Sequence, residues 1–161
     1  MTTLSSLIVD RFLMRVQDYK LDSIYNTSGS FVLNEYVEVW LLDAIDMFSP
    51  VCVEDLTYTS TSGSTEGYFT ATLSSEAQNI LSQIMVLHWL KREVQNALSM
   101  GLFVTDRDMK TFSSAQNLTA KKDFLIVKTE EIDQLIGGYA FRHNNWAQWE
   151  IQDFRPDNPY I

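Results

Sequence analysis

The residues that could carry catalysis are few in this chain, and they do not form a recognised catalytic pattern. The single cysteine, Cys52, has no basic neighbour in sequence that would lower its pKa, and only two histidines, His88 and His143, are present. The sequence lacks a phosphate-binding glycine loop, a CxxC or HExxH motif, a serine nucleophile elbow and an EF-hand spacing. We therefore expect a protein that is not an enzyme and that holds no metal and no cofactor.

The remaining candidates for chemistry are carboxylates at helical spacing. They lie in a segment whose apolar residues follow the helical period, and they are expected on the opposite face: Glu35, Glu38, Asp43 and Asp46. Because no histidine, lysine or metal ligand accompanies them, such a row is more typical of a solvated helix face than of an active site. An enzyme using paired carboxylates stays as a minor hypothesis.

The end of the chain has a different character. Pro156 and Pro159 exclude a helix over the last six residues, although the segment is rich in large side chains. The candidate partner-binding residues there are Trp146, Trp149, Ile151, Phe154, Arg155, Tyr160 and Ile161. Ordering such a segment costs about 1–2 kcal/mol per residue, so nearly all of its rings must find pockets. We predict an extended aromatic arm over 142–161, which either folds back on its own domain or docks on another molecule.

Charge is distributed unevenly along the chain. The net charge is −9, and no lysine or arginine occurs between Leu21 and Leu90, where nine acidic residues lie. An acidic surface repels phosphate, so DNA binding is not expected. Two interpretations of the acidic surface stay open. It either keeps the protein soluble or faces nucleic acid without binding it. The lone cysteine fits a reducing compartment, and we expect neither a secretory signal nor a membrane span.

Hydrophobic periodicity predicts one mainly α domain: a small bundle of about four helices with a β-hairpin insertion and an extended C-terminal arm. The bundle domain is expected over 1–141, with the hairpin at about 53–72 and the arm at 142–161. Helices are predicted at 4–17, 31–49, 75–99 and 114–137, and 18–30 is predicted to be a loop. The hairpin is expected to pair 53–59 with 68–72 around a tip at Gly63.

Several details accompany these elements. Apolar stripes are expected along the helices, made of Leu4, Leu7, Ile8, Phe12 and Val16 in the first and Leu118, Leu125, Ile132 and Tyr139 in the last. Gly101 and the pair Gly137–Gly138 are predicted to end the last two helices. Ser75 or Ser74 is the expected cap of the third helix. His88 is interpreted as a hydrogen-bonded core or interface residue and not as a ligand.

One order of motifs resembles a known group of proteins. A central helix ending in MVLHWLKREV at 85–94 is followed by TDRDMKTFS at 105–113, by AQNL at 115–118 and by a long amphipathic helix ending near 139–142. This order, with the short opening helix at 6–19, resembles the head-to-tail connector (adaptor or neck) proteins of tailed bacteriophages. The resemblance covers about two thirds of the chain.

The resemblance implies a structural virion protein that forms a ring, expected to be a dodecamer, between portal and tail. Its arm would dock on the portal protein, and further neck or tail proteins would follow. DNA would pass through the ring without specific binding, and the four helical carboxylates are candidates for lining the channel. The protein would be assembled in the host cytoplasm and reside in the virion neck. The alternative is a cellular helical adaptor that binds a soluble partner through the same tail.

Overall fold

The computed structural model describes residues 2–16, 18–62, 65–103 and 111–143, with the backbone alone for 97–103 and 111–118. Within these ranges the chain has four helices and three short strands. In chain order they are β1 (Thr3–Leu4), α1 (Ser5–Leu13), α2 (Tyr19–Phe48), β2 (Tyr58–Thr59), β3 (Tyr68–Phe69), α3 (Ser75–Phe103) and α4 (Thr111–His143). The expected mainly α fold with a β-hairpin insertion is confirmed. The expected arm lies outside the described residues from position 144 onward.

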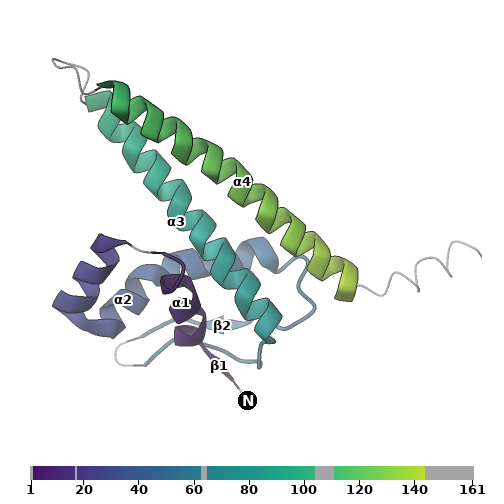
Figure 1. Cartoon of the computed structure of the whole chain (residues 1–161). Helices are drawn as coiled ribbons and strands as arrows, with labels where there is room; N and C mark the ends of the chain where they lie inside the picture. Colours follow the sequence, from purple (N-terminus) through teal and green to yellow (C-terminus); the bar gives the residue numbers. More distant parts are fainter. Residues whose placement is uncertain (1, 17, 63–64, 104–110, 144–161) are drawn as a thin grey trace, which may run out of the picture.

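The long helices α3 and α4 form an antiparallel hairpin that projects from a base made of α1, α2 and the sheet (Figure 1). In this view α1 lies beside the lower half of α3 and α2 passes behind α3, and both pack against α3. The core lies where these helices meet. Phe12 of α1 contacts Trp40 of α2 with ring centroids 5.5 Å apart, and Leu81, Ile84 and Met85 of α3 are fully buried. Burial of these apolar side chains is the main source of stability for the base.

The predicted hairpin is confirmed, but its strands are shorter than expected. Tyr58 pairs with Phe69 and Thr59 with Tyr68 in antiparallel register. An additional strand, β1, pairs with the other edge of β3, so the strand order is β1-β3-β2. The prediction of helix from residue 4 is therefore wrong at its start, because the backbone there forms sheet hydrogen bonds with β3. This third strand stabilises a hairpin that would be marginal alone. The expected tip at Gly63 lies outside the described residues.

The expected loop over 18–30 is wrong. Helix α2 begins at Tyr19, where the Asp18 side chain accepts a hydrogen bond from the Lys20 amide at 2.8 Å. The helix is kinked at Gly29, whose φ of 85° and ψ of 173° are not helical. Polar residues gave this segment a loop-like composition, but the cap and the buried Leu21 stabilise a helix. The second half of α2, predicted at 31–49, is confirmed.

The first helix is shorter than predicted, and its apolar stripe is partly wrong. Ile8, Phe12 and Val16 are buried as expected, but Leu4 and Leu7 are exposed. Leu7 lies on the side of α1 that faces away from the shared core, and Leu4 belongs to β1 and not to the helix. The predicted end at residue 17 lies outside the described residues.

Both long helices continue through the glycines that were predicted to end them. Helix α3 passes Gly101 and ends at Phe103, and α4 passes Gly137 and Gly138 and ends at His143. Glycine inside a helix costs only about 1 kcal/mol, which packing between antiparallel helices can offset. In the predicted α4 stripe Ile132 and Tyr139 are fully buried and Leu125 is half-buried, whereas the side chain of Leu118 is not described. The connecting turn at 104–110 lies outside the described residues.

Candidate interaction surfaces

Several carboxylates of the lysine- and arginine-free stretch hold the fold together. The Glu54 carboxylate accepts hydrogen bonds from the Ser74 amide at 2.8 Å and the Ser74 hydroxyl at 2.6 Å. The Ser74 hydroxyl oxygen in turn accepts from the Ala77 amide at 3.1 Å. Of the two expected caps of α3, Ser75 and Ser74, the cap is therefore Ser74. Glu66 accepts from the Ser6 amide at 2.6 Å and so caps α1 from a distant part of the chain.

Glu38 is the clearest correction to the sequence-based site. It was expected on the solvated face of α2, but it is buried, with 8% of its surface exposed. Its Oε1 accepts hydrogen bonds from the Tyr58 hydroxyl and the Thr61 amide, both at 2.8 Å. Burial and the Glu38 carboxylate both raise the pKa of Tyr58, which stays protonated and donates. Glu38 therefore ties the β-hairpin to α2 and is not available to line a channel.

The angular positions of the four carboxylates around the helix could have shown that Glu38 departs from the other three. At 3.6 residues per turn, Glu38 lies about 140° from Asp43, so the four carboxylates could not all share one narrow face. Glu35, Asp43 and Asp46 do lie on the outer side of α2, where Glu35 and Asp43 are exposed and Asp46 is at the surface. The sequence thus placed three of its four candidates correctly on the surface.

The outer side of α2 is not purely acidic. Val32, Val39 and Leu42 are exposed between the carboxylates, and Val39 has 60% of its surface exposed. We call this surface the α2 outer face and define it by Val32, Glu35, Val39, Leu42, Asp43 and Asp46. Exposed aliphatic groups do not help a channel surface to repel DNA. Burying them against a partner protein, in contrast, contributes favourable free energy to binding. The composition therefore favours a protein partner for this face.

Side chains of α3 border the α2 outer face on one edge. The Arg92 guanidinium lies over the Trp40 ring, 4.5 Å from its centroid, and donates to the Tyr36 hydroxyl at 2.7 Å. These contacts fix α2 against α3 and were not found from the sequence. The sequence shows that Arg92 follows an apolar helical run, but it does not show that Trp40 and Tyr36 are its aromatic partners.

His88 lies on the same edge, with Nδ1 3.5 Å from Oδ2 of Asp43. Its pKa is lowered by burial and by Lys91, against the opposing effect of Asp43, so the imidazole is neutral at pH 7. The contact with Asp43 is then not a salt bridge between two charges. Nε2 is buried and has no hydrogen-bond partner among the described residues, so the expectation of a fully hydrogen-bonded histidine is wrong for that nitrogen.

The root of the C-terminal segment is fixed to the base. Near the end of α4, Tyr139 is fully buried and packs edge-on against Phe48 with ring centroids 4.9 Å apart. Its hydroxyl lies 3.6 Å from Sγ of Cys52, whose pKa is raised mainly by burial. Arg142 pairs with Glu76, which lowers the pKa of that carboxyl, and His143 Nε2 lies 3.2 Å from the same carboxylate.

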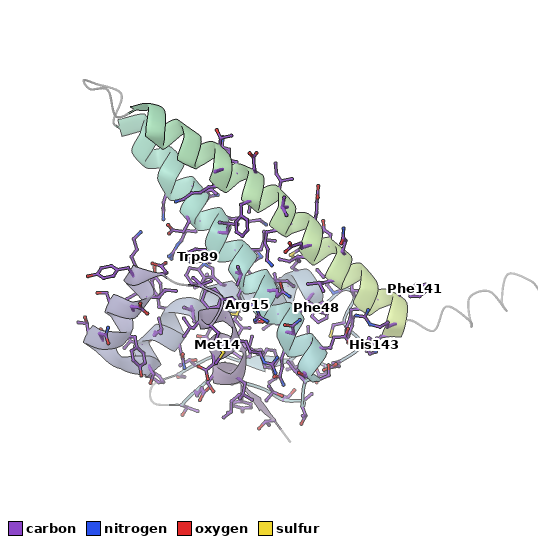
Figure 2. The ribbon with its side chains drawn as sticks, in the orientation of Figure 1. Met14, Arg15, Phe48, Trp89, Phe141 and His143 are labelled. Atoms are coloured by element: carbon purple, nitrogen blue, oxygen red, sulfur yellow. The ribbon has the colours of Figure 1, made fainter. Side chains whose placement is uncertain are left out.

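Two of these root residues, Arg142 and His143, were assigned to the arm from the sequence, but they belong to α4. Phe141 points outward beside them and is exposed (Figure 2). The predicted partner-binding residues Trp146, Trp149, Ile151, Phe154, Arg155, Tyr160 and Ile161 all lie outside the described residues. What is described is the end of α4 at His143, the residue that directly precedes this segment.

The described part of the chain contains no group of three or more metal-ligating side chains. A shallow depression of about 340 Å³ between α3 and α4 is lined by Gln83, Glu131, Gln134 and Leu135. No described helix is both long enough and apolar enough to cross a bilayer. Comparison with known proteins found no matching family, no matching curated protein and no matching solved structure.

Proposed function

We propose that this chain is a non-enzymatic structural protein of a tailed-phage virion, a head-to-tail connector that forms a ring between portal and tail. The proposal starts from the order of motifs at 85–142, which resembles that of such connectors. It is supported by the helical base with its projecting α3–α4 hairpin and by the α2 outer face, whose composition fits a protein partner. The ring is proposed to be a dodecamer, assembled in the host cytoplasm and retained in the virion neck.

The observation that carries the proposal is the fixed root of the aromatic segment. Tyr139 is buried against Phe48, and Glu76 holds both Arg142 and His143. Because these contacts hold the end of α4 against the base, the segment that follows starts from a defined position. The arm, with its tryptophans at 146 and 149, is therefore proposed to dock on the portal protein, where aromatic side chains supply most of the contact energy.

The charge of the chain is compatible with DNA passing through the ring. DNA binding is driven by cationic side chains that neutralise phosphates and release their counterions. A protein with a net charge of −9 is poorly suited to this. DNA is therefore proposed as a passing molecule and not as a ligand. Further neck or tail proteins would bind the side of the ring away from the portal.

Binding to the portal protein from the same genome tests the proposal. The full chain should co-sediment with the portal protein, and deletion of 146–161 should abolish binding while the helical circular dichroism signal is retained. A matched pair of variants refines the test: Trp146, Trp149 and Phe154 changed together to alanine should prevent binding, whereas Gln148, Gln152 and Asn158 changed to alanine should not. Portal binding that survives the deletion would refute the arm assignment. A soluble cellular partner captured in place of the portal would favour the adaptor alternative.

A further inference from the structure

The outer side of α1 carries a second mixed face, with the opposite charge. Leu7 and Met14 are exposed there, and Met14 has 85% of its surface exposed. Arg11 and Arg15 follow at helical spacing on the edge nearest α3, and Met14 and Arg15 lie in the turn directly after the last residue of α1. We call Leu7, Arg11, Met14 and Arg15 the α1 outer face.

The two arginines of this face are held by neutral groups. Arg15 donates to the Ser82 hydroxyl at 2.7 Å and to Oδ1 of Asn79 at 2.6 Å, and Arg11 donates to the Ser75 hydroxyl at 3.3 Å. Within the described parts of the chain, no carboxylate lies at ion-pair distance from either guanidinium. Two fixed guanidinium groups therefore present positive charge that this copy of the chain does not neutralise.

The α2 outer face is complementary to this arrangement. Val32, Val39 and Leu42 supply aliphatic surface, as Leu7 and Met14 do on α1. The carboxylates of Glu35 and Asp46 lie at the surface, and in the described chain no ion pair involves either of them. One face thus combines aliphatic groups with unneutralised arginines, and the other combines aliphatic groups with unneutralised carboxylates.

The two faces cannot satisfy each other within one molecule. Phe12 of α1 and Trp40 of α2 meet in the core at 5.5 Å, so the inner sides of the two helices face each other. Their outer sides consequently point away from the core in different directions. A contact between the α1 outer face of one copy and the α2 outer face of the next is heterologous, and repetition of such a contact generates a ring or a filament.

We propose that copies of this chain associate head to tail, with the α1 outer face of each copy packed against the α2 outer face of its neighbour. In this contact Arg11 and Arg15 approach Glu35 and Asp46 of the next copy. This inference rests on the proposed ring-forming function and specifies the surface that builds the ring. It places Glu35, Asp43 and Asp46 between copies and replaces the expectation that they line the channel.

Other charges border the contact. Asp10 is exposed on α1 beside Arg11, and Lys91 of α3 is exposed near the Asp43 edge of the α2 outer face. Each reduces the charge of its own face without reversing it. Glu35 and Asp46, without an ion-pair partner in the described chain, are the better positions to change.

A charge-swap experiment with the full chain alone tests this contact. One variant carries Arg11→Glu and Arg15→Glu, and the other carries Glu35→Lys and Asp46→Lys. In sedimentation velocity the wild type should associate, more weakly as salt is raised, and each variant should associate about tenfold more weakly or not at all. Mixing the two variants should restore association, because every α1–α2 contact between unlike variants pairs opposite charges again.

Matched controls separate this contact from general charge effects. Lys121→Glu with Lys122→Glu, and Glu130→Lys with Asp133→Lys, make the same charge changes at exposed positions of α4 and should leave association unchanged. Because Arg15 also contacts α3, Met14→Glu is a second test: this side chain is almost fully exposed, so the variant should fold, and it should still weaken association.

The outcomes are distinguishable. A wild type that remains monomeric at about millimolar concentration, where contacts of even weak affinity are populated, would overturn the inference. So would swapped variants that associate like the wild type, or a mixture that does not recover. No portal protein is present in this experiment. Head-to-tail association without portal binding would therefore refute the proposed function and leave the contact standing, and the reverse result would refute only the contact.

Discussion

The kink in α2 predicts that replacing glycine by alanine destabilises the fold at Gly29 but stabilises it at Gly137. Gly29 has φ of 85° and ψ of 173°, a region that is essentially restricted to glycine, and residues forced into it lose about 1–3 kcal/mol. No atom lies within 4 Å of the place where a Cβ would be, so backbone strain alone determines the result. We expect Gly29→Ala to destabilise the fold by about 1–3 kcal/mol.

Gly137 is the matched control. It lies inside α4, the space that a Cβ would occupy there is equally open, and its φ is not positive. Alanine is favoured over glycine in a helix by about 1 kcal/mol, so Gly137→Ala should stabilise the fold by about that amount. For a chain of this size each kcal/mol shifts Tm by about 2–4 °C.

Thermal unfolding followed by far-UV circular dichroism measures both effects. Gly29→Ala should lower Tm by about 2–12 °C, and Gly137→Ala should raise it by about 2–4 °C. A continuous helix through residue 29 would instead make the two substitutions equally favourable. A Tm for Gly29→Ala at or above that of the wild type would therefore refute the kink.

Three further predictions concern buried and paired side chains. Glu38→Ala leaves the Tyr58 hydroxyl and the Thr61 amide without their acceptor and should cost about 2–5 kcal/mol in chemical denaturation, whereas Glu35→Ala should cost less than about 0.5 kcal/mol; equal losses would contradict the buried role of Glu38. The pKa of Glu76 is lowered by Arg142. The stability that this carboxylate contributes is therefore fully present above pH 4.5, its ordinary pKa, and is lost as pH falls through its lower pKa in the folded state. The difference in unfolding free energy between the wild type and Glu76→Gln, below about 1 kcal/mol at this exposed pair, should therefore be largest near neutral pH and vanish in acid; a difference that does not change with pH would contradict the pairing. Cys52, with its pKa raised mainly by burial, should react with iodoacetamide more slowly than a free thiol at about pH 8, and a rate equal to that of the free thiol would show that α4 does not cover it.

Much of the helical core was predictable because apolar residues recur with the helical period. Leu33, Val37 and Leu41 fall on one stripe of α2 and are buried as expected. The hairpin was also predictable, since strand-forming residues flank a serine- and glycine-rich turn. These signals are local, and local patterns determine which side of an element faces the core.

The remaining features depend on partners distant in sequence. Thr3 forms a strand because β3 offers a free edge, and its hydroxyl oxygen accepts from the Leu73 amide at 2.8 Å. Glu66 caps α1 by accepting from an amide that lies 60 residues earlier in the chain. The helices continue through Gly101 and Gly137 because each packs along its neighbour. No local signal in the sequence identifies such partners.

The candidate site was predictable only in part, for the same reason. The surface position of Glu35, Asp43 and Asp46 followed from periodicity, but the burial of Glu38 followed from a contact with the hairpin. The positive α1 outer face was not recognised, because Leu7 was assigned to the core. Whether a surface leucine is covered depends on its position relative to other helices, which a single helical stripe does not determine.

Electron microscopy of the chain assembled on the portal protein of its own genome tests the central claim most directly. The connector account predicts a closed ring of copies around an open channel, with the segment after His143 of each copy lying against a portal subunit. A portal that carries no ring, or a ring in which those segments contact only their own α3–α4 hairpins, would contradict it.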